Sequence, residues 1–439
     1  MRLQTLILIL WLFVSQQVFC TPRTVVEQIA TTIEANYFDA HRGIEIGAGL
    51  REAATAGHFD SLTDPRDLAS VLSNRLQSFD HHFLVTWSAQ SASAEGLSVV
   101  QQASSRGLDE FERRTAYGFR RVEMLPGAIG YIDLRSFVDL PAGQEGPARR
   151  AADAALELVA NADAIILDLR NNPGGSPDMV GYLVSAFTDR NADIYNVFRY
   201  RDHNESERPK TAYPHPRLNV PLYVLISGRT ASAGESLAYT LQAARRAVVI
   251  GEISAGAANP GGAFPAAEGF SVFVSISTPV NPITGTNWDG SGVKPDVSVS
   301  AQQALGRAQV LALEGVLSAA AKGSEALDAQ WTLEALRAGY SRPTGPALAG
   351  YVGNYDGARV SLAADGNLEL RRGRRPPWTL LRVRADIFFV RDEPYRRVIF
   401  QRDAAGSVKR LQLLRAGGPS TWFSRDRLPL RGHRLLNPS

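Results

Sequence analysis

Short apolar runs alternate with helix-like segments through the middle of the chain, and this alternation restricts its fold more than any other feature. Residues 164–169 and 222–226 have the length and apolar bias of buried strands. Helical spacing follows each run, over 179–187 and 235–246, and 247–250 is typical of a further strand. Strands that alternate with helices predict a largely parallel sheet with right-handed crossovers. Functional groups in such sheets gather in the loops after the carboxyl ends of the strands.

One of these loops carries a serine just before a helix. Ser227-Gly228 ends the strand over 222–226, and Ser232 stands between that strand and the helix over 235–246. Free N–H groups and the positive end of the helix dipole would there stabilise an anion that forms beside the hydroxyl. Ser232 and Glu235 also fit a capping box, in which the serine caps the helix and the glutamate reaches back. The stretch alone leaves both interpretations open.

The flanking regions predict further domains. Three segments with helical spacing lie before residue 80, and the pattern over 78–87 turns into that of a strand. A connection rich in Ser, Ala and Gln follows, and Pro126-Gly127 then indicates a hairpin turn. After two more helical segments, the apolar period changes to two residues. We predict a helical N-terminal domain over 21–87, an α/β core over 108–325 and an all-β C-terminal module over 346–432.

The N-terminus has the pattern of a secretion signal. One positive charge, Arg2, precedes an apolar core over 6–14, which is too short to span a bilayer as a helix. We expect cleavage after residue 20 and a periplasmic or secreted protein, with no other membrane segment. A lipid anchor on Cys20 is the second choice, because Phe19 is not a small residue. Cys20 is the only cysteine, so cleavage after it excludes disulfides and a thiol nucleophile.

Composition is that of an ordinary globular protein, with 44% hydrophobic and 21% charged residues among 439. Charge is unevenly distributed, since residues 346–439 hold 18 Lys+Arg against 8 Asp+Glu while the whole chain has a net charge of +3. The arginines are scattered along strand-like segments and form no stripe with aromatic residues. We therefore expect a solvated basic face and no nucleic-acid partner. The seven histidines show no two-His helical spacing, and we expect neither metal nor cofactor.

Three segments match one family in order and spacing: Asp168-Leu-Arg-Asn-Asn-Pro-Gly-Gly175, Arg229-Thr-Ala-Ser-Ala-Gly-Glu235, and Gly251-Glu252 leading to Pro260-Gly-Gly262. Together they resemble the serine peptidases that include C-terminal processing peptidase and tricorn. Ile129-Gly-Tyr-Ile-Asp-Leu134 and the segment from Asn281 to Asp296 are similar to the branch related to interphotoreceptor retinoid-binding protein. The resemblance covers about 25–300. It implies an α/β core of the crotonase type with a helical N-terminal region.

The resemblance also implies roles for single residues. Ser232 falls on the nucleophile, and the N–H of Ala233 with an N–H of Gly174 or Gly175 would form the oxyanion hole. The lysine base of the processing peptidases aligns with Ala257, so we expect the histidine of the tricorn branch instead, at His82 in Asp80-His81-His82-Phe83. The acid of that branch falls on Asp289. A base that titrates near neutrality activates a serine hydroxyl, and a carboxylate fixes its tautomer.

Several positions depart from the family pattern. Asp289 stands where glutamate is more usual, His81 where tricorn-type sites place a serine, and Asn259 where a histidine is often found. Alone, His82 could be a satisfied strand residue, Asp289 a turn residue, and the glycines a packing requirement. We expect His81, as its neighbour on a strand, to point to the opposite face.

The predicted function is that of a serine peptidase acting on peptides or unfolded proteins. Oligomers are compatible with the sequence. The alternatives are a binding protein for retinoid-like or fatty ligands on the same fold, and a carboxylic-ester hydrolase with the same catalytic groups.

Overall fold

This computed structural model describes residues 21–89, 109–140, 145–267, 269–319, 324–339 and 348–426. The predicted secretion signal, nearly all of the predicted connection over 88–107 and the last residues of the predicted β module lie outside the described residues. The chain divides into two compact units. The first consists of Met1–Asp109, Val197–Ser206 and Asn259–Val280, and the second of Glu110–Asn196, Glu207–Ala258 and Asn281–Ser439.

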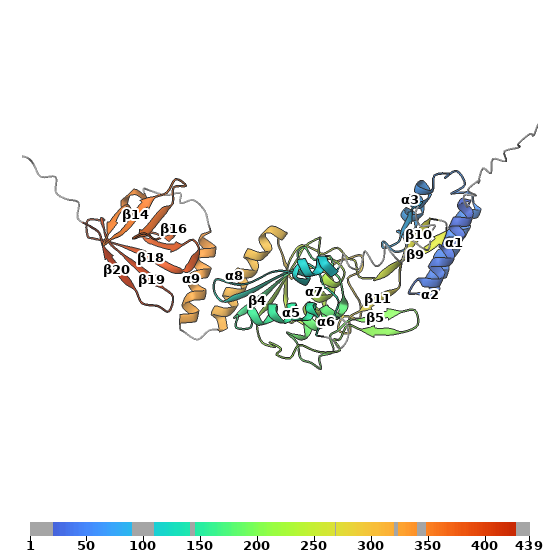
Figure 1. Ribbon diagram of the computed structural model, residues 1–439, viewed down its shortest axis with the longest axis horizontal. Helices are drawn as coiled ribbons and strands as arrows, with labels where there is room; N and C mark the ends of the chain where they lie inside the picture. The colour runs from blue at the N-terminus through green and yellow to red at the C-terminus, as the bar shows by residue number, and fades with distance from the viewer. Residues whose placement is uncertain are drawn as a thin grey trace, which may run out of the picture. The chain divides into compact units, whose positions relative to one another are not determined.

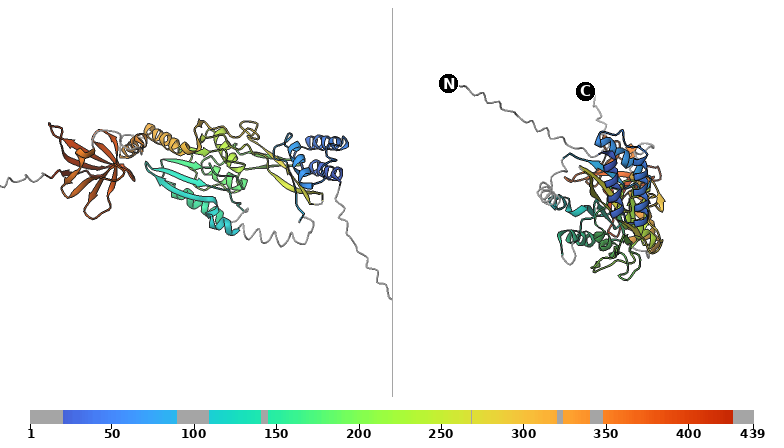
Figure 2. Two further views of the ribbon diagram at one scale, coloured as in Figure 1. Left: turned by 90° about the horizontal axis from the view of Figure 1, so that it is seen from above. Right: turned by 90° about the vertical axis from the view of Figure 1, so that its right-hand side faces the viewer.

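Three helices open the first unit: α1 (Pro22–Asn36), α2 (Ala40–Thr55) and α3 (Pro65–Leu76). The residue before each helix caps it: the side chains of Thr21, Asp39 and Asp64 each accept a backbone N–H from the first turn of the helix that follows. The helices predicted here are confirmed, and they start earlier than the apolar spacing indicates because the caps lie before it. Helices α1 and α2 lie side by side in Figure 2.

Strands from a distant part of the chain complete the first unit. β1 (Leu84–Trp87) pairs with β10 (Phe270–Ser275), which pairs with β9 (Gly261–Ala267), all antiparallel. The buried side chains of α1, α2 and α3 share one core with Val272 and Val274 of β10. A second sheet has the order β11 (Ser277–Val280), β5 (Val197–Tyr200), β6 (Asn204–Ser206). Figure 1 shows β9 and β10 beside the N-terminal helices.

The second unit is built around a six-stranded sheet with the order β12-β8-β7-β4-β3-β2. All of its neighbours pair in parallel except β2 with β3, which form the predicted hairpin. The strands are β2 (Phe119–Leu125), β3 (Ile129–Leu134), β4 (Ala164–Asp168), β7 (Leu222–Ile226), β8 (Val248–Gly251) and β12 (Val297–Ser298). The predicted mixed α/β core with a largely parallel sheet is therefore confirmed.

Helices cover both faces of this sheet because successive strand residues point to opposite sides. Ile165 and Leu167 of β4 pack in one cluster with α5 (Pro147–Leu158), α6 (Pro177–Ser185) and α7 (Ala233–Ala243). Ala164 and Ile166 pack on the other face with α8 (Ala301–Ala319) and α9 (Ser324–Ala338). The buried strands thus carry continuous apolar runs, as the sequence predicted.

The C-terminal part of the second unit is an antiparallel sheet of eight strands in chain order. The strands are β13 (Gly353–Tyr355), β14 (Ala358–Leu362), β15 (Leu368–Arg372), β16 (Trp378–Arg384), β17 (Ile387–Val390), β18 (Glu393–Arg402), β19 (Val408–Arg415) and β20 (Thr421–Ser424). The predicted all-β character of this module is confirmed. Among the helices in the part of the chain that the structure describes, none is both long and apolar enough to cross a membrane.

Candidate active site

Three loops meet at the carboxyl edge of the central sheet. They follow β4, β7 and β8, and hydrogen bonds join them directly. The Ala231 N–H donates to the Asn172 carbonyl (3.0 Å), and the Ala255 N–H donates to the Thr230 carbonyl (2.9 Å). The Ser227 hydroxyl donates to the Arg170 carbonyl at 2.5 Å. These bonds hold Ser232 at the edge where the strand pattern predicts functional groups.

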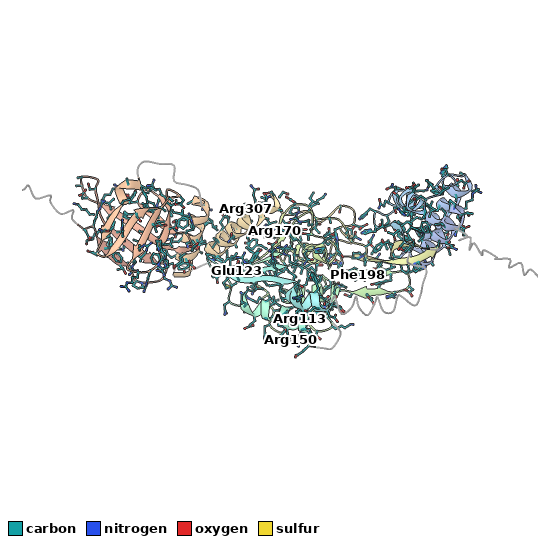
Figure 3. All side chains as sticks on the ribbon, turned by 45° about the horizontal axis from the view of Figure 1, so that its top comes forward. Arg113, Glu123, Arg150, Arg170, Phe198 and Arg307 are labelled. Atoms are coloured by element: carbon teal, nitrogen blue, oxygen red, sulfur yellow. The ribbon has the colours of Figure 1, made fainter. Side chains whose placement is uncertain are left out.

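The base of these loops is fixed by charged groups of the core. The Arg170 guanidinium donates to both carboxylate oxygens of Asp168, at 2.9 and 2.5 Å, and to the Ala301 carbonyl at the start of α8. Arg170 is labelled in Figure 3. The Tyr131 hydroxyl donates to the same carboxylate at 2.6 Å. Burial raises the pKa of Asp168, but the hydrogen bonds from Arg170 and Tyr131 outweigh it and lower that pKa overall. Asp168 and Arg170 thus make structural bonds.

Ser232 has a strained backbone at the start of α7. Its φ is 51° and its ψ is −121°, outside the extended region that residues before a helix usually adopt. Non-glycine residues with positive φ are uncommon, and such strain is concentrated at functional sites. The residue is half-buried. The turn therefore presents Ser232 in a conformation that helix capping alone does not require.

Two backbone N–H groups near Ser232 have no acceptor within the described residues: those of Ala233 and Gly175. The N–H of Gly174, by contrast, donates to the Asn172 side-chain oxygen at 2.8 Å. Gly174 contributes its missing side chain instead. A Cβ there would lie 2.8 Å from the Ser232 Cβ and 3.1 Å from the Ala233 nitrogen. The backbone of residue 174 thus approaches the serine as closely as a glycine allows.

Glu235 holds the turn that contains Ser232 through hydrogen bonds to its buried carboxylate. Its fully buried carboxylate accepts the Ser232 N–H at 2.8 Å, which is the glutamate half of the predicted capping box. It also accepts the Ser254 hydroxyl at 2.6 Å and the N–H groups of Gly256 (2.6 Å) and Ala257 (2.9 Å). Four donors therefore satisfy one buried charge. Ala257, where the family's lysine would stand, presents only a backbone group to this carboxylate.

Asp289 belongs to a loop that is bonded to the same assembly. Its carboxylate accepts the Ala258 N–H at 3.1 Å, and the Gly290 N–H donates to the Gly256 carbonyl at 2.9 Å. The Val293 N–H donates to the Ser254 hydroxyl at 2.6 Å, and this hydroxyl donates to Glu235. The structure therefore brings the loop of Asp289 into one hydrogen-bonded network with the backbone of Ser232.

His82 lies in the first unit, in the turn between α3 and β1. Its Nδ1 lies 2.7 Å from the Asp80 carboxylate, which also accepts the His82 N–H at 2.9 Å. The prediction that His81 points away from His82 is wrong, since their ring centroids are 4.0 Å apart. The strand begins only at Leu84, so the alternation of strand side chains does not apply to these two residues.

Asp80, His81 and His82 also form a possible set of metal ligands, with one ligand atom of each within 4.8 Å of the others. The hydrogen bonds explain the carboxylate without an ion. Asp80 accepts two bonds from His82, one from the Tyr37 hydroxyl at 3.2 Å and one from the Ser275 hydroxyl at 2.8 Å. Its oxygens are therefore saturated by protein donors, and the cluster is best described as a carboxylate–imidazole pair.

The sequence interpretation assigned no role to Asp80 in the first unit or to Asn172 in the second unit. Asp80 occupies the first position of a turn, and the Phe83 N–H donates to its carbonyl at 3.1 Å. An aspartate in that position commonly accepts the N–H two residues later, so the sequence Asp-x-His contained a usable signal. Asn172 donates to the Leu134 carbonyl at 3.0 Å, a contact between distant segments that no local pattern predicts.

Comparison with known proteins identifies the segment that carries this assembly. Residues 128–299 match the family model described as peptidase family S41. The carboxy-terminal-processing protease of Bartonella bacilliformis is 31% identical over 178 residues, which cover 39% of this chain and 39% of that protein. The carboxyl-terminal-processing protease of a Picosynechococcus species is 28% identical over 190 residues, which cover 42% of this chain and 41% of that protein. The chain thus matches less than half the length of these curated relatives.

Solved structures are similar to this chain at lower sequence identity. The photosystem II D1 C-terminal processing protease aligns with a TM-score of 0.42 and 14% identity, over 64% of this chain and 94% of that chain. The sequence motifs had indicated a resemblance to C-terminal processing peptidases. The family model and the curated relatives confirm this resemblance, and the match to peptidase family S41 extends over residues 128–299.

Proposed function

We propose that this chain is a serine peptidase that hydrolyses peptide bonds with Ser232 as its nucleophile. The observation that carries the proposal is the strained turn at Ser232, which stands at the start of α7 beside two N–H groups without an acceptor in the described residues. The relatives named as carboxyl-terminal processing proteases support the same reaction class. We expect peptides or unfolded proteins as substrates.

The proposed oxyanion hole consists of the N–H groups of Ala233 and Gly175. Attack by the Ser232 hydroxyl turns the scissile carbonyl oxygen into an oxyanion, which two amide donors and the N-terminus of α7 would stabilise. The N–H of Gly174, the other predicted donor, is already bonded to Asn172. Gly174 would serve by allowing the close approach of the backbone. Removing one such donor typically slows an acyl transfer by about 10²–10³-fold.

His82 is the proposed general base and Asp289 the proposed acid, as the family resemblance implies. The base takes the proton of Ser232 as the hydroxyl attacks and later gives it to the leaving amine. A carboxylate stabilises the imidazolium that forms between these steps. The shared crotonase-type fold, the branch related to interphotoreceptor retinoid-binding protein and the periplasmic or secreted location remain predictions that accompany this proposal.

The nucleophile is tested by Ser232→Ala. We expect this variant to lose hydrolysis of an unfolded protein such as reduced, alkylated casein, and to lose labelling by a serine-reactive fluorophosphonate. Ser300→Ala is the matched control, because Ser300 also precedes a helix, α8, and bonds to Gln303. Full labelling of the Ser232→Ala variant would contradict the proposal. Binding of an apolar ligand by a wild-type protein that neither hydrolyses nor labels would favour the alternative, a carrier.

A further inference from the structure

The Asp80 carboxylate binds His82 both at its imidazole ring and at its backbone N–H. One carboxylate oxygen lies 2.7 Å from the ring Nδ1 and accepts the backbone N–H at 2.9 Å. The side chains of Asp80 and His82 are only 4% and 12% exposed. A residue that is hydrogen-bonded at both its backbone and its ring has little freedom to rotate its side chain.

The other oxygen of Asp80 is fixed by distant elements of the first unit. It accepts the Tyr37 hydroxyl, at the end of α1, and the Ser275 hydroxyl, at the end of β10. The turn after α3 is thus attached to the helices and to the sheet at one carboxylate. Such supporting hydrogen bonds keep a catalytic side chain within the narrow range of orientations that a reaction needs.

We propose that Asp80 is the positioning residue that fixes the orientation and tautomer of His82 as general base. The inference rests on the proposed function, and it names a carboxylate that the family resemblance does not. An ionised carboxylate only accepts hydrogen bonds, so the ring nitrogen facing Asp80 must be the one that donates. A neutral imidazole has one N–H, so its Nε2 then carries the lone pair that accepts the proton of a serine hydroxyl.

The carboxylate stays ionised under ordinary conditions. Burial, the largest single influence, raises the pKa of Asp80, but the hydrogen bonds from the His82 ring and backbone and from Ser275 outweigh it and hold the pKa at about 2. The Asp289 carboxylate accepts the Ala258 N–H. The proposal therefore gives Asp80 the orientation of the base and leaves to Asp289 the acid role named in the proposed function.

The direct test reads the tautomer of His82 by nitrogen-15 NMR of histidine-labelled protein. The Ser232→Ala variant is used, so that the measurement does not depend on turnover. The proposal expects the His82 resonances of the Nδ1–H form, with loss of that form when Asp80→Asn is added to Ser232→Ala. An Nε2–H tautomer at His82 in the protein with Asp80 intact would overturn the proposal, whether or not the Asp80→Asn variant folds.

The kinetic test compares three single variants on the same peptide substrate. Asp80→Asn should lower kcat about 10³–10⁴-fold with little change in KM, as expected when a triad carboxylate no longer fixes its histidine. Asp289→Asn, which removes the proposed acid instead, should also lower kcat. Tyr37→Phe removes another donor to Asp80 while leaving the carboxylate–imidazole pair, and should stay within about tenfold of wild type.

The outcomes are separable from failure of the proposed function. If Ser232→Ala abolishes hydrolysis while Asp80→Asn retains kcat within tenfold of wild type, the peptidase assignment stands and the role of Asp80 is refuted. If Ser232→Ala retains full hydrolysis, the nucleophile is refuted, and the NMR measurement still decides whether Asp80 fixes the His82 tautomer.

Discussion

Ser232 combines a strained backbone with a buried anchor, and the two features explain each other. A non-glycine residue in such a conformation costs on the order of 1–3 kcal/mol and persists only where its surroundings determine it. Glu235 supplies that determination, because it binds the Ser232 N–H and three donors of the 254–257 loop. The same serine could therefore be predicted from sequence as both a helix cap and a nucleophile.

Gly174→Ala should slow catalysis through a single methyl group. The added Cβ would lie 2.8 Å from the Ser232 Cβ and 3.1 Å from the Ala233 nitrogen, in a backbone with φ of 117°. We expect kcat to fall by about 10²-fold or more, as when one oxyanion donor is lost. The measurement is steady-state hydrolysis together with the rate of fluorophosphonate labelling.

Gly366→Ala is the control for backbone strain in that experiment. Gly366 has φ of 83°, and a Cβ there would meet nothing within 4 Å. The control should lower stability by about 1 kcal/mol and leave kcat unchanged. Equal kcat values for the alanine variants at 174 and 366 would show that the close approach to Ser232 has no catalytic consequence.

Glu235→Gln should weaken both stability and activity. One of the two carboxylate oxygens becomes an amide NH₂, which cannot accept hydrogen bonds from the two donors that face it. Leaving such buried donors unbonded costs about 1–3 kcal/mol. Urea unfolding and kcat measure the two effects. Glu252→Gln is the matched control, because the exposed Glu252 accepts a single N–H, from Ala301. Unfolding curves that coincide for Glu235→Gln and wild type would contradict the anchoring role.

At the residue scale, the sequence predicts the features whose determinants are local. Ser232, Ala233 and Gly175 come from turns that directly follow predicted strands, so their placement at one sheet edge could be expected. The contacts of Asn172 with Leu134 and of Asp80 with Tyr37 and Ser275 depend on packing between distant segments. Hydrophobic periodicity carries no information about such contacts.

Helix α7 contacts a second buried acid besides its own Glu235, namely Glu207 in the segment after β6. Ser236 and Thr240 of α7 lie in a polar network with Asn196 and Glu207. The Ser236 hydroxyl donates to Glu207 at 2.6 Å, and no cation is among the groups that shift the Glu207 pKa. Burial, opposed by the bonds from Ser236 and Asn196, raises the pKa of Glu207 to about 7. We therefore expect the contribution of α7 packing to stability to depend on pH.

The sign of this dependence follows from proton binding. The ordinary pKa of a glutamate is near 4.5, and that of Glu207 in the folded protein is about 7. Between these two pH values, the folded protein holds a proton on Glu207 that the unfolded chain releases. The contribution of Glu207 to stability is thus fully present below about 4.5 and is lost as pH rises through about 7. The expected loss is on the order of 3 kcal/mol.

Glu207→Gln checks that contribution. The amide cannot ionise, so the free energy of unfolding of the variant should lack the decrease between about pH 5 and about pH 8 that the Glu207 carboxyl gives the wild-type protein. Urea titrations at both pH values measure it. The control is Glu205→Gln, since Glu205 is exposed. A pH dependence that is identical in wild type and Glu207→Gln would rule out the raised pKa.

At the element scale, caps and apolar runs predicted the helices and central strands, because both signals are local. The prediction could not assign β9 and β10 to the N-terminal helices. That pairing joins Leu84 with Phe273 across the whole central segment of the chain. Its energy comes from burying Val272 and Val274 against α1, α2 and α3, which is a property of the assembled unit.

On the scale of the whole molecule, α9 connects the α/β core to the β module within the second unit. Ala329 and Leu333 pack into the core cluster that also holds α8. Ala335 packs with Leu381 and Phe389 of the module. A helix that is apolar on both sides is expected between two packed layers. The module is therefore attached by a shared helix, in addition to its covalent connection.

Arg397 supplies the polar part of that attachment. The side chain is 1% exposed, and it donates to the Trp331 carbonyl of α9 and to the Pro394 carbonyl, both at 2.6 Å. Its guanidinium also lies 5.1 Å from the Trp331 ring centroid. Burial lowers the pKa of Arg397 below its usual range, while Glu334 acts in the opposite direction. The charge is thus held by carbonyl groups, an aromatic ring and one carboxylate.

Arg397→Ala should therefore loosen the module without affecting chemistry at Ser232. Removing the guanidinium takes a donor from the Trp331 and Pro394 carbonyls and opens a gap beside Trp331, at a cost of about 1–3 kcal/mol. Tryptophan fluorescence during urea unfolding measures this loss, and fluorophosphonate labelling in dilute buffer measures the nucleophile. Arg410→Ala is the control, because Arg410 stacks on Trp422 at the surface. If Arg397→Ala stays folded but labels much more slowly than Arg410→Ala, the β module affects the reactivity of Ser232 as well as the stability of the chain. The contacts of α9 with both the module and the core would then carry this effect to the sheet edge.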